Sequence, residues 1–220
     1  MRHATIALFL LTSVIAVPAH AQKWSFGAGA GPFVFGDFAK ETFTPIGGGG
    51  ETTTVKLTGK SDVGFTVDFE RGFNDRFAIR LQGAFTDSKL QVKSSGAGGI
   101  SLDAGTLDVT TITIPLVIRF NPHGTFRFHI LGGPAYAMYD IKRENTPAGV
   151  PDTFSGTRSN WGGAVGGGVE WWLSDRWALT GEIADIVTAS PFHEDDFNGS
   201  KVDIPKPQNV HTTAGIRIRF

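Results

Sequence analysis

Nine charged side chains of this chain lie at alternate positions within segments that are otherwise apolar or rich in small residues. They are four acids and five bases: Asp68, Glu70, Arg80, Arg119, Arg127, Glu170, Glu182, Arg217 and Arg219. Because side chains alternate across a β-strand, this spacing places the charges on one face and apolar residues on the other. Carboxylates and guanidinium groups that share a confined space can pair, or they can line a passage that selects ions. The chemistry of this set therefore depends on the space that the strands enclose.

The clearest alternating segment is the one that ends at Phe220. One face carries Thr212, Ala214, Ile216, Ile218 and Phe220, and the other carries Thr213, Gly215, Arg217 and Arg219. A soluble core does not readily accept two arginines on its inner face, because an unpaired buried charge is costly. In a membrane barrel the apolar face meets lipid and the polar face meets the lumen. The segment therefore predicts a membrane-spanning strand.

Seven earlier segments show the same alternation. With the last one, the predicted strands cover residues 23–38, 62–70, 76–85, 111–120, 126–138, 160–173, 177–184 and 212–220. The connections alternate long and short, and the long ones cover about residues 39–60, 87–105, 140–159 and 187–208. Bacterial outer-membrane barrels have an even number of strands, short periplasmic turns and longer extracellular loops. We therefore predict an all-β fold, an eight-stranded antiparallel up-and-down transmembrane β-barrel, whose last strand pairs with its first because lipid cannot satisfy an open sheet edge.

Aromatic residues support this orientation. One group lies beside the short turns or chain ends: Trp24, Phe69, Phe77, Phe120, Phe126, Trp171, Trp177 and Phe220. A sparser group lies toward the long loops: Phe35, Phe85, Tyr136 and Trp161. Two aromatic girdles are typical of a spanning barrel, whereas a soluble β-sandwich would bury the same residues in its core. Within the segment 126–138, Gly132-Gly133-Pro134 predicts a bend or a β-bulge.

The amino-terminal residues predict export. Residues 1–3 are Met-Arg-His, residues 6–17 are mostly apolar, and Ala19-His20-Ala21 is a small-x-small cleavage pattern. The alternative, a membrane anchor, needs about 20 apolar residues, which this run does not reach. We predict a signal peptide over residues 1–21 and a barrel domain over residues 22–220. The chain has no cysteine, so disulfides cannot stabilise it, and its 20 basic and 21 acidic residues do not favour a nucleic-acid partner.

At this point the chain resembles the small eight-stranded outer-membrane barrels of the OmpA/OmpX kind, within the outer membrane protein β-barrel domain families. The resemblance rests on the signal peptide, residues 111–116, 131–134 and 162–170, and the terminal Phe220. It implies the cell outer membrane as location and the outer-membrane assembly machinery as a partner, which in this family reads the carboxyl-terminal Phe. The chain looks like the barrel-only form. Such barrels serve as adhesins, pores, lipid-modifying enzymes and anchors, so the resemblance implies an architecture and no single activity.

The lumen charges have two interpretations. An eight-stranded barrel is only wide enough for side chains to fill it, and opposite charges in that space should pair. We predict that the nine charges form a salt-bridged plug in the periplasmic half, with a selectivity lining of a narrow channel as the alternative. Above them the inward positions are small, for example Gly29, Gly64 and Gly166. These glycines either leave an outward-opening cavity filled with water or are simply what a tight barrel needs.

Other chemistry has weaker support. Ser190 and His193 lie near each other in the last long loop, but a hydrolase needs a nucleophile bonded to an oriented base. The run from His193 to Asp196 could hold a divalent cation, although it matches no known loop motif. His129 points into the lumen, where we expect a hydrogen-bonded core histidine. A secreted lipocalin-like barrel remains a rival, and it would have an apolar interior and a polar exterior.

We therefore expect a monomeric, non-catalytic outer-membrane protein without cofactors or catalytic residues, which serves a structural or surface-interaction role. A narrow pore for small solutes or ions is the alternative, and a lipid-modifying enzyme is a weaker one. The expected partners are outer-membrane lipid, the assembly machinery at the last strand, and an extracellular ligand at the four long loops, because loops on a rigid scaffold carry recognition.

Overall fold

The computed structural model describes residues 24–43, 52–95, 99–143, 155–197 and 202–220. The strands are β1 (Trp24–Phe35), β2 (Asp37–Phe43), β3 (Thr53–Gly59), β4 (Asp62–Gly72), β5 (Phe77–Ser95), β6 (Ser101–Thr113), β7 (Leu116–Phe120), β8 (Phe126–Arg143), β9 (Gly156–Trp172), β10 (Trp177–Thr188) and β11 (Gln208–Arg219). A short 3-10 helix, η2 (Glu194–Phe197), precedes the last strand. The predicted signal peptide lies outside the described residues. No helix among the described residues is long and apolar enough to cross a membrane.

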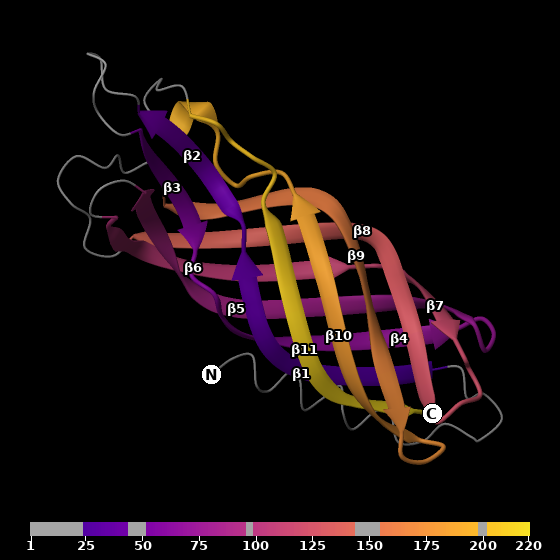
Figure 1. Ribbon diagram of the computed structural model, residues 1–220. Helices are drawn as coiled ribbons and strands as arrows, with labels where there is room; N and C mark the ends of the chain where they lie inside the picture. The colour runs from indigo at the N-terminus through magenta and orange to yellow at the C-terminus, as the bar shows by residue number, and fades with distance from the viewer. Residues whose placement is uncertain (1–23, 44–51, 96–98, 144–154, 198–201) are drawn as a thin grey trace.

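The strands close into an antiparallel ring with eight walls (Figure 1). The walls follow the order β1, β4, β5, β6 with β7, β8, β9, β10 and β11. The last strand returns to the first, since Ser25 pairs with Arg219 and Phe26 pairs with Ile218. Closure satisfies the backbone groups of both edges, as lipid requires. The predicted eight-stranded barrel is confirmed.

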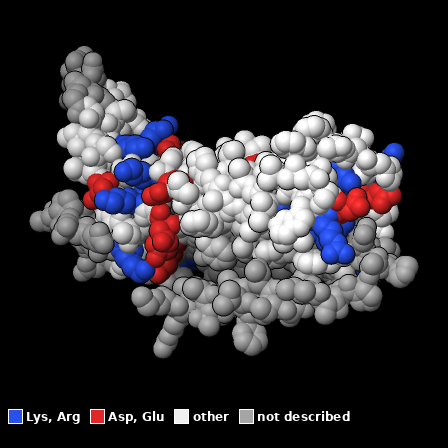
Figure 2. Space-filling view, turned by 90° about the horizontal axis from the view of Figure 1, so that it is seen from below, with Lys and Arg blue, Asp and Glu red and all other residues white. Residues whose placement is uncertain are grey.

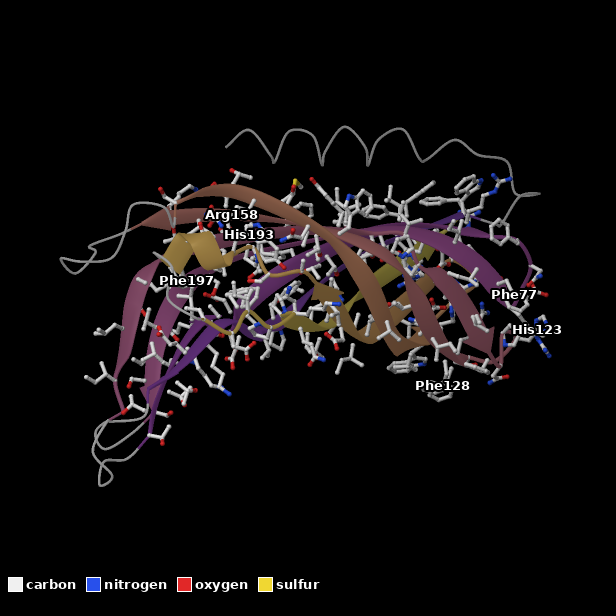
Figure 3. The ribbon with its side chains drawn as sticks, turned by 90° about the horizontal axis from the view of Figure 1, so that it is seen from above. Phe77, His123, Phe128, Arg158, His193 and Phe197 are labelled. Carbon is white, nitrogen blue, oxygen red and sulfur yellow. The ribbon has the colours of Figure 1, made fainter. Side chains whose placement is uncertain are left out.

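Alternation sorts the side chains between lipid and lumen. On β4 the outward Phe65 is 63% exposed, whereas on β5 the inward Arg80 is only 1% exposed. The outward aromatics at the short turns are similarly exposed, and Phe128 points away from the wall in Figure 3. An apolar exterior over the middle of the barrel is the reverse of what a soluble barrel would present. The lipocalin-like alternative is therefore wrong.

The barrel wall extends beyond the predicted strands at the end opposite the short turns. β2 and β3 occupy most of the segment predicted as the loop 39–60, and β5 and β6 run through most of the predicted loop 87–105. β3 also pairs with the far end of β5, so these strands project as a sheet beyond the rim (Figure 1). These loop predictions were wrong. Strands that extend beyond the lipid need no apolar outer face, so their polar sequence resembles that of a loop.

Of the bend or β-bulge expected at Gly132-Gly133-Pro134, the bulge does not form. β8 keeps one register with β9 through this stretch, from Leu131 opposite Gly166 to Pro134 opposite Gly163. The interruption lies instead on the neighbouring wall, between β6 and β7, where Pro115 has no N–H to donate. The carbonyl of Pro115 still accepts a hydrogen bond from the backbone N–H of Arg80, at 3.0 Å.

Phe35 does not belong to the outer aromatic girdle. It is 7% exposed and faces the lumen, where its ring centroid lies 6.4 Å from that of Phe38. Phe35 is an even number of residues from Ser25 on β1, so the two side chains share the inward face of the strand. Phe35 therefore faces the lumen although it lies near the rim. Trp161 does face outward, is 73% exposed and packs on Tyr136 with ring centroids 5.0 Å apart.

Candidate functional site

Arg80 is the centre of a charged layer at the short-turn end of the lumen. It projects inward from β5, and its guanidinium donates to Glu70 Oε2 from Nε at 3.1 Å and from Nη2 at 3.0 Å. Its Nη1 donates to Glu182 from across the barrel, and its Nε lies 3.7 Å from Asp68 Oδ1. One buried guanidinium therefore joins three carboxylates that come from β4 and β10.

Two further arginines complete the pairing. Arg217 on β11 lies 2.8 Å from Asp68 Oδ1, 3.1 Å from Glu70 Oε2 and 3.4 Å from Glu170 Oε1. Arg119 on β7 forms an ion pair with Glu70, and its Nε lies 3.7 Å from Glu170 Oε2. All seven of these charged groups are buried. Each carboxylate has a guanidinium partner, which is the condition under which buried charges are tolerated.

Neighbouring polar side chains add further hydrogen bonds to the layer. Gln82 Nε2 donates to Glu182 Oε1 at 2.9 Å, and the Nε2 atom of His129 lies 3.0 Å from Glu182 Oε2. Trp172 Nε1 donates to Glu170 Oε2 at 3.0 Å. Arg217 Nη1 donates to Ser25 Oγ at 3.2 Å. The layer is thus a connected network with members from every wall of the ring, and His129 is the hydrogen-bonded lumen histidine that the sequence predicts.

Arg127 and Arg219 stand apart from this network. Both are only partly buried and lie against the ring of Trp172, with guanidinium carbons 4.7 Å and 3.8 Å from its centroid. Neither forms an ion pair with a carboxylate among the described residues; Arg127 Nε instead donates to the carbonyl of Gly124 at 3.1 Å. The structure therefore brings together seven of the nine predicted lumen charges and leaves two at the mouth, stabilised by cation–π contacts.

A second layer, apolar and aromatic, occupies the end of the lumen opposite the short turns. Phe38 is fully buried there, with ring centroids 5.9 Å from Tyr139 and 6.1 Å from Phe192. The cluster also holds Phe33, Phe35, Ala39, Leu57, Ala84, Leu90, Leu107, Val109, Ala137, Ile141 and Val202. The prediction of an outward-opening cavity filled with water is wrong for this part of the lumen. The small residues make room for rings: a Cβ on Gly64 would lie 2.5 Å from the ring of Phe33.

The segment between β10 and β11 packs over this apolar layer. Ser190 Oγ donates to the carbonyl of Phe38 at 2.8 Å, and Phe192 is buried in the cluster. Asp203 exchanges two backbone hydrogen bonds with Lys40 of β2, each 2.8 Å long. The segment thus reaches from one side of the opening to the other and inserts Phe192 and Val202 into the lumen.

Polar contacts hold the same segment at the rim. Arg158 on β9 forms an ion pair with Asp196 and donates from Nη1 to the carbonyl of Pro191 at 2.8 Å. Figure 3 places Arg158 and His193 together beside η2, at the opposite end of the barrel from Phe77 and His123. The hydrogen bond from Arg158 keeps the pKa of Asp196 below its usual value. The ion pair of Arg158 with Asp196 and the apolar packing of Phe192 therefore both hold this segment against the barrel.

The residues considered for catalysis and metal binding have structural partners. Ser190 donates to the Phe38 carbonyl, and the backbone N–H of His193 donates to Asp196 Oδ2 at 2.8 Å. Asp196 is engaged by Arg158, so its carboxylate is not available to a cation without breaking that pair. Among the described residues no group of three His, Asp or Glu side chains could hold a metal ion.

Sequence reasoning missed Ser25, Gln82 and Trp172 in the charged layer. The alternation of the strands could have found two of them. Trp172 lies on the same strand face as Glu170, and Gln82 lies on the same face as Arg80. The apolar layer was missed for another reason: Leu57 and Leu90 lie in segments whose polar neighbours had suggested loops, and Phe38 is the last residue of a predicted strand. Phe192 reaches Phe38 from more than 150 residues away in sequence, which no local pattern reveals.

Comparisons with known proteins agree with this architecture. The outer membrane protein beta-barrel domain family matches residues 7–217. The outer membrane protein OprG from Pseudomonas aeruginosa is a structural neighbour with 16% identity and a TM-score of 0.56, over 91% of this chain and 97% of that one. Neisserial surface protein A has 9% identity and a TM-score of 0.54, over 91% and 98%. No curated protein sequence matches significantly.

A protease is also among the structural neighbours. The outer membrane protease OmpT from Escherichia coli has 8% identity and a TM-score of 0.50, over 94% of this chain and 99% of that one. At such low identities these likenesses concern the fold alone. They do not indicate an activity, which depends on the particular residues of the lumen and the surface.

Proposed function

Because the chain belongs to the outer membrane protein beta-barrel domain family and is located in the outer membrane, we propose that it is a non-conducting, non-catalytic barrel with a structural or surface-interaction role. In this proposal the lumen is a packed support and not a passage. The barrel holds its extracellular sheet above the membrane, where a partner can bind the exposed surface.

The observation that carries the proposal is the closure of one lumen by two unlike layers. Arg80, Glu70 and Glu182 join opposite walls near the short turns, so an ion would have to break buried pairs to pass. At the other end the rings of Phe38, Tyr139 and Phe192 are packed together, and the Tyr139 hydroxyl is already hydrogen-bonded to Thr188 and Asn209. A conducting lumen would need polar groups that exchange partners with water, and neither layer supplies them.

Planar bilayer recording tests this proposal. The purified protein is first shown to be folded by its heat-modifiable migration on a gel, and is then inserted at increasing amounts. We expect no steady, reproducible openings. Regular openings of uniform size would overturn the proposal and favour the alternative of a narrow pore for small solutes or ions.

A matched variant shows that the recording can detect an open lumen. Replacing Glu70, Arg80 and Arg217 together by Ser removes the centre of the charged layer while leaving the outward face unchanged. This variant should conduct only if Phe38 is also replaced by Ala, since either layer alone suffices to block ions. Conduction by the triple variant alone would assign the block to the charged layer.

A further inference from the structure

The outward face of the extracellular sheet carries lysines in register across three strands. Lys40 on β2 lies directly opposite Lys56 on β3, and Lys56 lies directly opposite Lys93 on β5. Their neighbours Leu57 and Val92 face the apolar layer, so the three lysines face outward. Nearer the membrane, the backbone N–H of Lys60 donates to the carbonyl of Lys89 at 2.7 Å, which brings two more lysines together.

This lysine patch, comprising Lys40, Lys56, Lys60, Lys89 and Lys93, continues the lipid-facing side of the barrel. On β5 the outward Phe85 is followed on the same face by Asp87, Lys89 and Lys93. Asp87, Asp108 and Asp140 lie opposite one another on β5, β6 and β8, and so form a row just beyond the apolar surface. Figure 2 shows acidic side chains in a band beside the uncharged middle of the barrel, with basic side chains beyond the band.

The two lysine levels lie outside the hydrocarbon core at different heights. With about 3.4 Å per residue and a strand tilt of about 40°, Lys89 lies about 10 Å beyond Phe85 along the membrane normal. Lys93 lies about 20 Å beyond it by the same reckoning. The polar headgroup zone of an ordinary leaflet is only about 5–7 Å deep. A lipid of the leaflet that reaches both levels must therefore have a large headgroup.

The charges of the patch call for an external anion. Like charges directly opposite each other on neighbouring strands repel, and Lys40, Lys56 and Lys93 form two such pairs. Lys56 Nζ has an acidic partner, Asp37, at 2.7 Å, and Lys89 Nζ has Asp103 at 3.0 Å. The ammonium groups of Lys40, Lys60 and Lys93 have no ion pair with any described residue. Bound phosphate would offset this repulsion.

We propose that the lysine patch binds the phosphate groups of a phosphorylated glycolipid in the outer leaflet around the barrel. Lys60 and Lys89 contact phosphates nearest the acyl chains, and the row of Lys40, Lys56 and Lys93 contacts phosphates farther out on the sugar headgroup. The acyl chains lie against the apolar surface of β4 and β5 directly below, which distinguishes a lipid from a soluble anion. Such binding would fix lipid to one side of the barrel, because the patch is confined to the β2, β3 and β5 sector.

The test uses the full mature chain in mixed micelles, titrated with a phosphorylated glycolipid and with the same lipid after its phosphates are removed. The triple variant K40Q/K56Q/K93Q should bind the phosphorylated form about 100-fold more weakly than the unchanged protein, at about fivefold per lysine. The matched variant K40R/K56R/K93R keeps the charges and should bind as the unchanged protein does. The dephosphorylated lipid should bind weakly to all three.

Several outcomes would overturn the proposal. Equal binding of the two lipid forms, or equal binding by the Gln and Arg variants, removes the lysines from lipid recognition. Equally tight binding of inorganic pyrophosphate would make a soluble anion the ligand. The substitutions avoid both lumen layers, so folding should survive and is checked by heat-modifiable migration. If the triple Gln variant fails to fold, K93Q alone, with an expected fivefold loss, provides the same test against K93R.

Discussion

The two ends of the lumen are closed by opposite means. Near the short turns, seven buried charges form pairs whose geometry is fixed by hydrogen bonds. At the end opposite the short turns, rings and aliphatic side chains pack around Phe38 mainly through apolar contacts. A charged layer fails when one partner is lost and another is left unpaired, whereas an apolar layer fails by forming a cavity. The two layers should therefore respond differently to substitution, pH and access from solvent.

The largest effect is expected from Arg80→Met. Glu182 would lose its guanidinium partner, since Arg80 is the one that pairs with it among the described residues. Breaking a buried pair costs about 3–5 kcal/mol, which should appear in the free energy of unfolding by urea in lipid vesicles, followed by tryptophan fluorescence. Adding Glu182→Gln should restore part of the loss, because it removes the unpaired charge.

A control for Arg80→Met is Lys56→Met, which removes a pair with Asp37 that is partly exposed to solvent. Exposed pairs contribute about 0–1 kcal/mol, so this variant should unfold almost as the unchanged protein does. A loss below about 1 kcal/mol for Arg80→Met would show that the charged layer does not behave as a buried network.

The apolar layer is tested by Phe38→Ala. The side chain is fully buried against Phe35, Tyr139 and Phe192, so its removal should cost about 3 kcal/mol through lost burial and a cavity. We expect the damage to be local, with faster proteolysis of the segment 189–207 than of the strands. Phe38→Leu keeps most of the volume and should cost less. Equal proteolysis of Phe38→Ala and the unchanged protein would contradict the packing of this segment over the layer.

The smallest effect is expected at the rim, and it depends on pH. The pKa of Asp196 is held below its usual value, chiefly by the hydrogen bond from Arg158. The ion pair therefore contributes fully at neutral pH, and its contribution of about 1 kcal/mol is lost as the pH falls below about 4 and through the lowered pKa. Proteolysis of the segment 189–207 by an acid-active protease should rise in that range. Asp196→Asn should show the same sensitivity at neutral pH, and no difference between the two proteins at pH 7 would contradict the role of this pair.

The contrast between the layers also explains what could be predicted from sequence. Alternation alone placed Asp68, Glu70, Arg80, Arg119, Glu170, Glu182 and Arg217 on the lumen face, and the ring of eight walls followed from the strand count. The face that a side chain occupies depends only on its odd or even position along the strand, so it can be predicted without knowledge of the fold. Arg127 and Arg219 also lie on the lumen face. They lie close to the mouth of the barrel, where they contact Trp172 and form no ion pair with the carboxylates of the charged layer.

The apolar layer could not be predicted in this way. Several of its residues, such as Leu57, Leu90 and Ile141, come from wall segments that had been predicted as loops because their outward face is polar. Phe33 and Phe35 share the inward face of Ser25 by parity, although Phe35 was predicted to lie in the outer aromatic girdle. Phe192 joins them only through the path of a long connection. Contacts between such distant segments depend on the closed ring, which positions β2 beside the segment that leads into β11.

Solvent access to the space between the two layers tests closure most directly. Ala184 faces inward from β10, two residues beyond Glu182 and two before Ile186, and it is 2% exposed. The chain has no cysteine, so Ala184→Cys supplies a unique thiol, and Lys93→Cys supplies an exposed control. In the folded protein in vesicles, the thiol at position 184 should not react with a membrane-impermeant reagent from either side, although it reacts fully after unfolding. Rapid reaction in the folded protein from one side would show that the layer facing that side is open, and reaction from both sides would contradict a closed lumen altogether.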